Sequence, residues 1–409
     1  MLDSRTRAAV ARLVTAVLSV KPLLDGIAAP VRVMPVAGDP AAPAARGPAL
    51  DEVLRRVTRA AGVEGLALSP GLAAGDLQVF ERVISDRLAL AELPDSLAAL
   101  PDELLDEVEE VAAAAVADGF DAYFHKETIR SPDGVPLTVY GAGQGETVVL
   151  IPACGMPAAL TESWMRYLAR DRRVLAWETR GLFDAADHHG DFAVDLATQA
   201  ADLFTVLDHH GVASAHVIGL CGGAVMALAA AAAQPGRISS LSLWHGAYEF
   251  ASGSPRTRFQ NDLIELMALA ARSRAAARSV QTAFCQVALT STPAQVAHFV
   301  LYPYTGPELF YRYCRLNDSL ARTDVGQYLT KVKQPTLVVT SLDDETAHPE
   351  GSRQVAGGLP NARLWMMPHG DHASLFHADD SLLRVAVDFI AEAVADSPAA
   401  PAPEDSRTE

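Results

Sequence analysis

A cysteine at a sharp strand-to-helix turn is the first feature that could do chemistry. The stretch from Val217 to Ala231, VIGLCGGAVMALAAA, is predicted to be a buried strand, a turn that carries Cys221, and an alanine-rich helix. A thiolate there could attack a carbonyl carbon, because the start of a helix supplies positive partial charge that favours a thiolate over a thiol. Gly219 and Gly223 flank the turn, where larger side chains would clash with neighbouring elements. The alternative is a small buried cysteine that only packs.

An acid and a histidine follow the cysteine in the chain, each behind a predicted strand. The strand TLVVTS is followed by Asp343 and Asp344, and the strand RLWMMP is followed by His369 and His372. A histidine can take the proton of the thiol, and a carboxylate can fix its tautomer and stabilise the imidazolium. The alternative is that these are polar residues at loop tips.

The elements that must position these residues are read from the hydrophobic periodicity. Strands that alternate with helices from about residue 126 predict an α/β fold, with a mostly parallel sheet covered by helices on both faces. The strand candidates are Val148–Pro152, Arg173–Trp177, His216–Leu220, Leu241–Trp244, Thr336–Ser341 and Arg363–Met367. The predicted organisation is a helical N-terminal extension (1–125), a first core part (126–251), a helical cap (252–328), a second core part (329–396) and a disordered tail (397–409). The first third is expected to be all helical, with Pro30–Pro48 as a linker.

The turn Gly-x-Cys-x-Gly, with an acid and a histidine behind later strands, resembles the α/β-hydrolase fold over about residues 125–395. The resemblance implies that fold, with a helical cap and a helical N-terminal extension. By the spacing usual in the family, Asp344 and His372 are the triad partners of the cysteine. The resemblance also implies two backbone donors for the oxyanion, the N–H groups of Gly222 and, in the segment CGMPAALTESW, of Met156.

Three further positions are interpreted through this resemblance. Cys154 stands where the family usually has histidine, and it is predicted to pack, with a disulfide to Cys221 as the alternative. In the segment WETRG, Glu178 and Arg180 are predicted to be structural rather than catalytic.

A cysteine nucleophile makes the covalent intermediate a thioester, which is close in energy to the thioesters that carry acyl groups on phosphopantetheine. The helical N-terminal segment, the cysteine turn and the helical cap together resemble the α/β-hydrolase aminoacyltransferases that move an amino acid between carrier proteins in nonribosomal peptide pathways. The resemblance implies acyl- or aminoacyl-loaded carrier proteins as partners, with phosphopantetheine carried by those partners and no bound cofactor. The alternatives are a cysteine hydrolase, in which water accepts the acyl group, and a ligand-binding protein without catalysis.

Composition and net charge limit the classes of partner that the protein can bind. The chain has 409 residues, half of them apolar, and a formal net charge of −17, which disfavours binding to nucleic acid. No stretch has the length and apolar character of a membrane span, and four cysteines without regular spacing fit reduced thiols, so a cytoplasmic protein is expected. A docking site for an acidic carrier could include four cap arginines, with a solvated helix face as the alternative: Arg258, Arg272, Arg274 and Arg278.

No metal site is predicted. The pairs His188–His189 and His209–His210 could contribute ligands, but no third ligand follows either pair at a suitable spacing.

Overall fold

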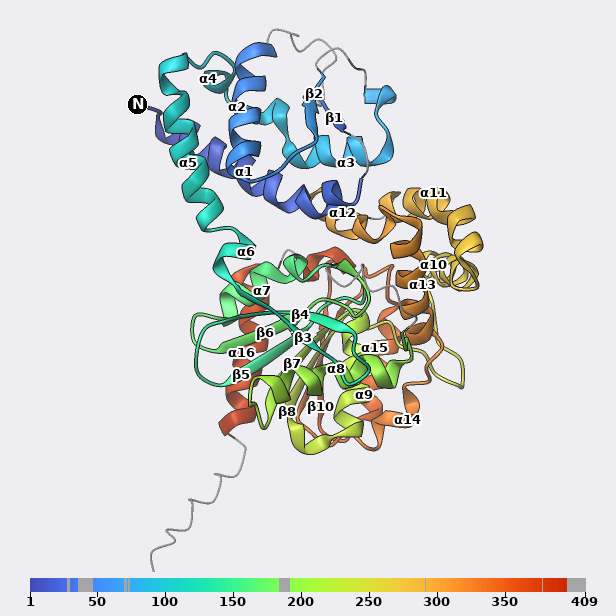
Figure 1. Cartoon of the computed structure of the whole chain (residues 1–409). Helices are drawn as coiled ribbons and strands as arrows, with labels where there is room; N and C mark the ends of the chain where they lie inside the picture. The colour runs from blue at the N-terminus through green and yellow to red at the C-terminus, as the bar shows by residue number, and fades with distance from the viewer. Residues whose placement is uncertain are drawn as a thin grey trace, which may run out of the picture.

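A computed structural model describes residues 1–27, 30–35, 47–69, 72, 74–183, 192–290, 292–376 and 378–395. The chain forms two lobes, an upper one made by the N-terminal helices and a lower one built around a sheet (Figure 1). The predicted tail 397–409 lies outside the described residues.

The lower lobe contains an eight-stranded sheet with the order β10-β9-β8-β7-β5-β6-β4-β3. The strand β4 is antiparallel to both of its neighbours, β3 and β6, and every other neighbouring pair is parallel. The strands β5–β10 therefore bring their carboxyl ends to one edge. The strands are β3 (His125–Arg130), β4 (Pro136–Ala142), β5 (Thr147–Ile151), β6 (Arg173–Trp177), β7 (Ala215–Leu220), β8 (Ile238–Trp244), β9 (Thr336–Ser341) and β10 (Ala362–Met367). The six predicted strands correspond to β5–β10, so the mostly parallel sheet is confirmed.

Helices cover both faces of the sheet because successive strand residues alternate between two apolar clusters. Val148 and Leu150 of β5 pack with one cluster, and Val149 and Ile151 pack with the other. The first cluster includes residues of α7 (Glu162–Leu168) and α16 (Asp380–Ala395). The second includes residues of α8 (Leu196–His209), α9 (Gly222–Ala233) and α15 (Pro349–Gly358).

The segment between β8 and β9 is helical, as the cap prediction requires, and no named strand occurs in its described residues. It contains α10 (Arg258–Ala270), α11 (Arg274–Thr290), α12 (Ala294–Val300), α13 (Pro307–Ala321) and α14 (Gly326–Leu329). In Figure 1, α10, α11 and α13 lie to the upper right of the sheet, and α12 lies directly under the upper lobe.

The upper lobe corrects the prediction that the first third is all helical. Its helices are α1 (Ser4–Asp25), α2 (Gly47–Ala60), α3 (Val79–Leu88), α4 (Asp95–Ala98) and α5 (Leu105–Ala117), with the short α6 (Phe120–Tyr123) leading into the sheet. Two short strands, β1 (Val31–Val33) and β2 (Leu66–Leu68), pair in parallel. The first falls inside the predicted linker, where Arg32 forms an ion pair with Glu81 of α3. Strands of three residues are too short to show a periodicity, which explains the error.

The two lobes meet along α12, which packs against α1 and α3. At the end of α1, Gly26 lies so close to Thr305 that an added Cβ would be 2.7 Å from the Cβ atom of Thr305. None of the described helices has the length and hydropathy needed to cross a membrane.

Candidate active site

Cys221 occupies a strained turn between β7 and α9, at the carboxyl edge of the sheet. Its backbone has φ 54° and ψ −119°, in a region that L-residues rarely adopt. The two flanking glycines allow this turn to pack. A Cβ on Gly219 would lie 2.6 Å from Cα of Ala224, and a Cβ on Gly223 would lie 2.7 Å from the carbonyl oxygen of Pro152. The steric role predicted for both glycines is confirmed.

Asp344 is a buried carboxylate that accepts four hydrogen bonds. Its Oδ2 accepts from Nδ1 of His372 at 2.9 Å and from Nδ1 of His245 at 2.7 Å. Its Oδ1 accepts from the backbone N–H groups of Thr346 at 2.9 Å and Ala347 at 2.8 Å. Burial opposes the negative charge, but the two histidines outweigh it and hold the pKa of Asp344 below its usual value. Asp344 is therefore ionised and acts as the acceptor in these bonds.

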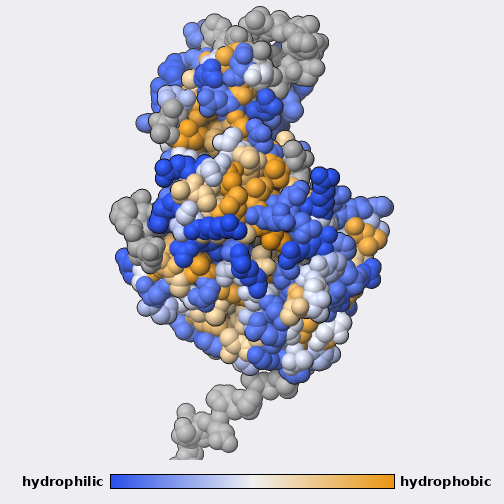
Figure 2. Space-filling model, turned by 90° about the vertical axis from the view of Figure 1, so that its right-hand side faces the viewer, coloured by the Kyte–Doolittle hydropathy of each residue, from blue (hydrophilic) through white to orange (hydrophobic). Residues whose placement is uncertain are grey.

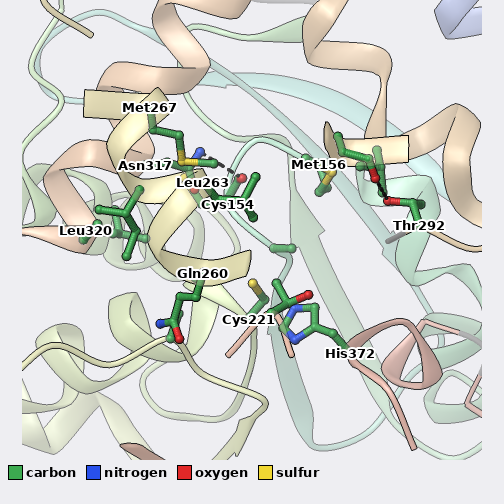
Figure 3. Close-up of a pocket in the computed structure, with 18 of the residues that line it drawn as sticks. Cys154, Met156, Cys221, Gln260, Leu263, Met267, Thr292, Asn317, Leu320 and His372 are labelled. Carbon is green, nitrogen blue, oxygen red and sulfur yellow. Dashed lines mark hydrogen bonds between the residues drawn. The ribbon is translucent and has the colours of Figure 1, made fainter. Parts of the chain in front are cut away.

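His372 faces the same cavity as Cys221, next to it (Figure 3). Burial disfavours the imidazolium, but the charge of Asp344 and interaction with the Cys221 thiol raise the pKa of His372 well above 6.5. A histidine in this setting can hold the proton that the thiol loses.

The turn that carries His372 is anchored by contacts to two other elements. Nε1 of Trp164 in α7 donates to the carbonyl oxygen of Leu375 at 2.8 Å. The hydroxyl of Ser341, at the end of β9, donates to the carbonyl oxygen of Gly370. These bonds fix the imidazole relative to the sheet edge.

His245 is a site residue that the sequence analysis missed. It follows β8 directly, its side chain is fully buried, and its φ of 48° turns it towards Asp344. Since its Nδ1 donates to the carboxylate, its Nε2 is the atom left over, and that atom has no partner among the described residues. A polar residue directly behind a strand was the available signal, since Asp344 and His372 were found by the same criterion.

His245, Asp344 and His372 also have the composition of a metal site, because their ligand atoms lie within 4.8 Å of one another. The hydrogen bonds from both histidines to one carboxylate oxygen account for this arrangement. The alternative acid and base, Asp343 and His369, form a separate, exposed pair with 3.2 Å between Oδ2 and Nδ1.

The two predicted oxyanion donors differ in how they are placed. Gly222 is the first residue of α9, so its N–H has no partner within the helix, and the residue lines the cavity. Met156 lines the cavity as well, but its N–H donates to the carbonyl oxygen of Ala153 at 2.9 Å. The oxyanion role of Met156 stays a prediction. It requires this N–H to donate to the oxyanion as well as to Ala153, or to rotate away from Ala153.

Cys154 is buried and is a free thiol, as is Cys221, so the structure contains no disulfide between them. Its Sγ donates to Oε1 of Gln199 at 3.5 Å. Burial and the neighbouring Cys221 raise the pKa of the Cys154 thiol. These surroundings suit packing and disfavour a nucleophile.

The cavity in front of Cys221 has a volume of about 200 Å³ and lies between the sheet edge and the cap. Its walls are mainly apolar side chains of α10, α12 and α13, including Leu263, Met267 and Leu320 (Figure 3). Glu249 also lines it, but its carboxylate forms two hydrogen bonds with Arg256, at 2.8 and 2.6 Å. The cavity therefore suits an apolar group next to the nucleophile.

The remaining predicted residues lie outside this cavity. Arg180 is fully buried and binds Asp133 and Asp202, and Glu178 accepts from the N–H of Ala158 at 3.0 Å. Both are thus held in structural contacts.

The predicted histidine pairs and cap arginines also lie outside the cavity of Cys221 as far as the structure describes them. His209 and His210 both lie next to Glu127, at 2.8 and 3.4 Å, and His188–His189 lies outside the described residues. All four cap arginines are exposed, and Arg274 is paired with Glu308.

A sequence model of the alpha/beta hydrolase fold matches residues 146–379, which is more than half of the chain. The chain therefore belongs to the alpha/beta hydrolase fold family. Solved structures agree on the fold: a hydrolase from Pseudomonas aeruginosa PA01 superposes with a TM-score of 0.52 at 20% identity, covering 65% of this chain and 98% of its own.

Relatives found by sequence include a putative hydrolase, a transferase and a synthase. Over 258 residues the chain is 28% identical to the putative carbamate hydrolase RutD of Variovorax paradoxus, covering 62% of this chain and 94% of that protein. It is 25% identical over 175 residues to the L-allo-isoleucyltransferase of Pseudomonas savastanoi pv. glycinea, covering 42% of this chain and 61% of the transferase.

It is also 29% identical over 265 residues to the polyketide synthase ThaQ of Burkholderia thailandensis, covering 60% of this chain. The match spans only 12% of that synthase.

Proposed function

We propose that this protein is an acyltransferase that moves an acyl group between phosphopantetheine thiols of carrier proteins through a thioester on Cys221. The observation that carries the proposal is the cysteine on the strained turn, beside a histidine whose ring is held by the ionised Asp344. The similarity to an L-allo-isoleucyltransferase supports transfer as the reaction.

The proposed cycle has two mirror-image halves. His372 takes the proton from Cys221, and Sγ attacks the carbonyl carbon of the incoming thioester while the N–H of Gly222 donates to the oxyanion. The tetrahedral intermediate collapses, the C–S bond to pantetheine breaks, and His372 returns the proton to the leaving thiolate. A second pantetheine thiol then attacks the enzyme thioester by the same steps in reverse.

The sulfur nucleophile favours transfer for an energetic reason. Exchange of one thioester for another is nearly level in free energy, and a thiol attacks the enzyme thioester more readily than water does. The apolar walls around Cys221 limit the water near the intermediate.

The cavity also bears on the acyl group. Its apolar lining fits an aliphatic side chain, and Glu249, which is already paired with Arg256, is poorly suited to bind a further positive charge deep in the cavity. We therefore expect an acyl or aminoacyl group with an apolar side chain to be preferred over one with a charged side chain.

Hydrolysis is the second candidate, because the similarity to the putative carbamate hydrolase covers almost the whole length of that protein. In this reading water replaces the second thiol, and His372 activates the water. The same cysteine, histidine and aspartate would serve both reactions, so product analysis must separate them.

Intact-mass measurements after mixing the protein with an acyl-loaded and an empty carrier test the proposal. We expect an acyl adduct on the protein, loss of that adduct in Cys221→Ala, and a loaded second carrier. Cys221→Ser should acquire the acyl group but transfer it slowly, since an oxygen ester is a poorer donor than a thioester. Free acid as the main product would favour hydrolysis, and absence of any adduct or turnover would leave a binding protein.

A further inference from the structure

A large groove separates the upper lobe from the lower one. It has a volume of about 1460 Å³ and is lined by α1, α5 and α6 on one side and by α7, α12 and the segments around them on the other. Figure 2 shows the side of the molecule on which the cap helices lie, and there apolar residues gather at and below the narrowing between the two lobes. Apolar groove residues include Leu18, Leu160 and Phe299.

The groove and the cavity of Cys221 share two lining residues, Val296 of α12 and Phe376. The ring of Phe376 lies 6.3 Å from the ring of His372, measured between centroids. The groove and the cavity therefore meet at these two side chains. A chain-like substrate that lies in the groove could reach the nucleophile past them.

Arg87 is a groove cation for which the described residues supply no carboxylate partner. Arg87, at the end of α3, is partly buried, and its Nε donates to the hydroxyl of Ser19 in α1 at 2.9 Å. Within the part of the chain that the structure describes, no carboxylate forms an ion pair with it, and burial lowers the pKa of its guanidinium.

Three other basic groove residues each have a carboxylate partner. Ion pairs join Lys21 to Asp25 at 2.6 Å, Arg166 to Glu162 at 2.7 Å and Arg7 to Glu107 at 3.7 Å. The Ser19 hydroxyl donates its proton to the carbonyl oxygen of Ala16 at 2.8 Å, so it orients the guanidinium as an acceptor. The remaining N–H groups of this half-buried guanidinium are suitable donors to a phosphate group.

We propose that the groove receives the phosphopantetheine arm of a carrier protein, with its phosphate at Arg87 and its thioester directed past Val296 and Phe376 to Cys221. This inference rests on the proposed function, because it supplies the route for the substrate of that reaction. The arm has an anionic end, a polar middle and a thioester end, and the groove offers a cation at one place and the entrance to the reactive cavity at another. The upper lobe is then a wall of the substrate site.

Arg87→Gln is the first test, with Arg82→Gln as the matched control. Arg82 lies on the same helix, is exposed and does not line the groove, so both variants remove one positive charge from α3. We measure the rate of Cys221 acylation against the concentration of acyl-carrier and, separately, with a short acyl thioester that has no phosphate. Arg87→Gln should lower acylation by the carrier relative to the short thioester about tenfold, as expected for one charge-assisted hydrogen bond to phosphate. Arg82→Gln should leave that ratio within about twofold, the range of an exposed charge.

Binding measurements separate this inference from the proposed reaction. The wild-type protein should bind the carrier with its arm more tightly than the same carrier without it, and Arg87→Gln should remove that difference. If the difference appears without any acylation, the reaction is wrong and the groove assignment stands. If acylation occurs and Arg87→Gln behaves like Arg82→Gln, the groove assignment is wrong and the reaction stands.

A steric variant and acyl-coenzyme A provide two further tests. Thr15→Trp, at an exposed groove position of α1, should slow acylation by the carrier more than acylation by the short thioester. Equal slowing of both would indicate a general structural effect and overturn the inference. Acylation by acyl-coenzyme A as fast as by acyl-carrier would overturn the assignment to a carrier-borne arm.

Discussion

At the scale of single residues, the site differs from a simple triad because Asp344 serves two histidines. His372 faces the reaction cavity, whereas His245 is buried and donates to the same carboxylate oxygen. A second donor stabilises the charge of Asp344 and holds its side chain in place. We assign His245 as a positioning residue that acts on His372 through Asp344.

His245→Leu removes the second donor while keeping a buried apolar side chain. With one hydrogen bond fewer, the charge on Asp344 is less neutralised, so the pKa of His372 should rise further above its already raised value. Titration of the His372 imidazole signals by NMR measures this, and the acylation rate measured across pH should move with it.

His369→Gln is the control, because His369 is exposed and pairs with Asp343 instead. An unchanged or lower titration midpoint for His372 in His245→Leu would show that His245 does not act through Asp344.

The raised pKa of His372 also affects the stability of the fold. The interaction between His372 and Asp344 stabilises the fold fully below pH 6.5, the ordinary pKa of histidine, and this contribution is lost as pH rises through the folded-state pKa of His372.

At the scale of secondary-structure elements, a buried arginine joins three parts of the lower lobe. Arg180, just after β6, donates to both carboxylate oxygens of Asp133 in the turn between β3 and β4, and to both of Asp202 in α8. It also donates to the carbonyl oxygen of Ala193 at 3.0 Å. Its side chain is only 1% exposed, so these partners cannot be replaced by water without rearrangement.

Arg180→Met should destabilise the protein strongly, because it leaves the buried Asp202 without its partner. Loss of one member of a buried ion pair costs about 3–5 kcal/mol in the free energy of unfolding. Chemical denaturation followed by circular dichroism measures the loss. Arg130→Met is a suitable comparison, since that exposed arginine donates to the carbonyl oxygen of Gly134 and should change stability by less than about 1 kcal/mol. Equal effects of the two variants would contradict the structural role given to Arg180.

The sequence predicts the elements that follow strong local rules. Strand-and-helix alternation predicts β5–β10, and the glycines beside Cys221 predict the strained turn because only glycine fits those close approaches. Asp344 and His372 could be found because each follows a strand whose end lies at the same edge. Three features escaped prediction for physical reasons. The strands β1 and β2 are too short to show a periodicity. His245 is recognised only by its hydrogen bond to Asp344, which is distant in the sequence. Arg87 is recognised only by its tertiary contacts, which the sequence does not show.

At the scale of the whole molecule, the two lobes are packed closely enough to act on one another. The end of α1 touches the segment after α12, with Gly26 against Thr305, and α12 also packs against α1 and α3. Val296 and Val300 of α12 line the cavity of Cys221. A disturbance between the lobes should therefore reach the substrate site.

Gly26→Val tests this contact, with Gly75→Val as the matched control. A Cβ at position 26 would meet Thr305, whereas a Cβ at position 75 would have nothing within 4 Å, and neither glycine has a positive φ. Forcing extra atoms into packed space costs about 1–3 kcal/mol, so Gly26→Val should lower stability and reduce protection of α12 amides in hydrogen exchange. Equal stability and equal α12 protection in the two variants would show that the lobes do not support each other here.

The position of α12 has a consequence for anyone who recombines this protein with its relatives. Residues of this helix line the cavity of Cys221, and the helix also packs against α1 and α3. Its sequence must therefore be compatible with both the cavity and the N-terminal helices. A chimera that exchanges only the sheet and its triad would combine the cavity of one protein with an α12 that packs against the N-terminal lobe of the other. Grafts that keep α1–α5 together with α10–α13 are the ones that should inherit the parent's choice of substrate.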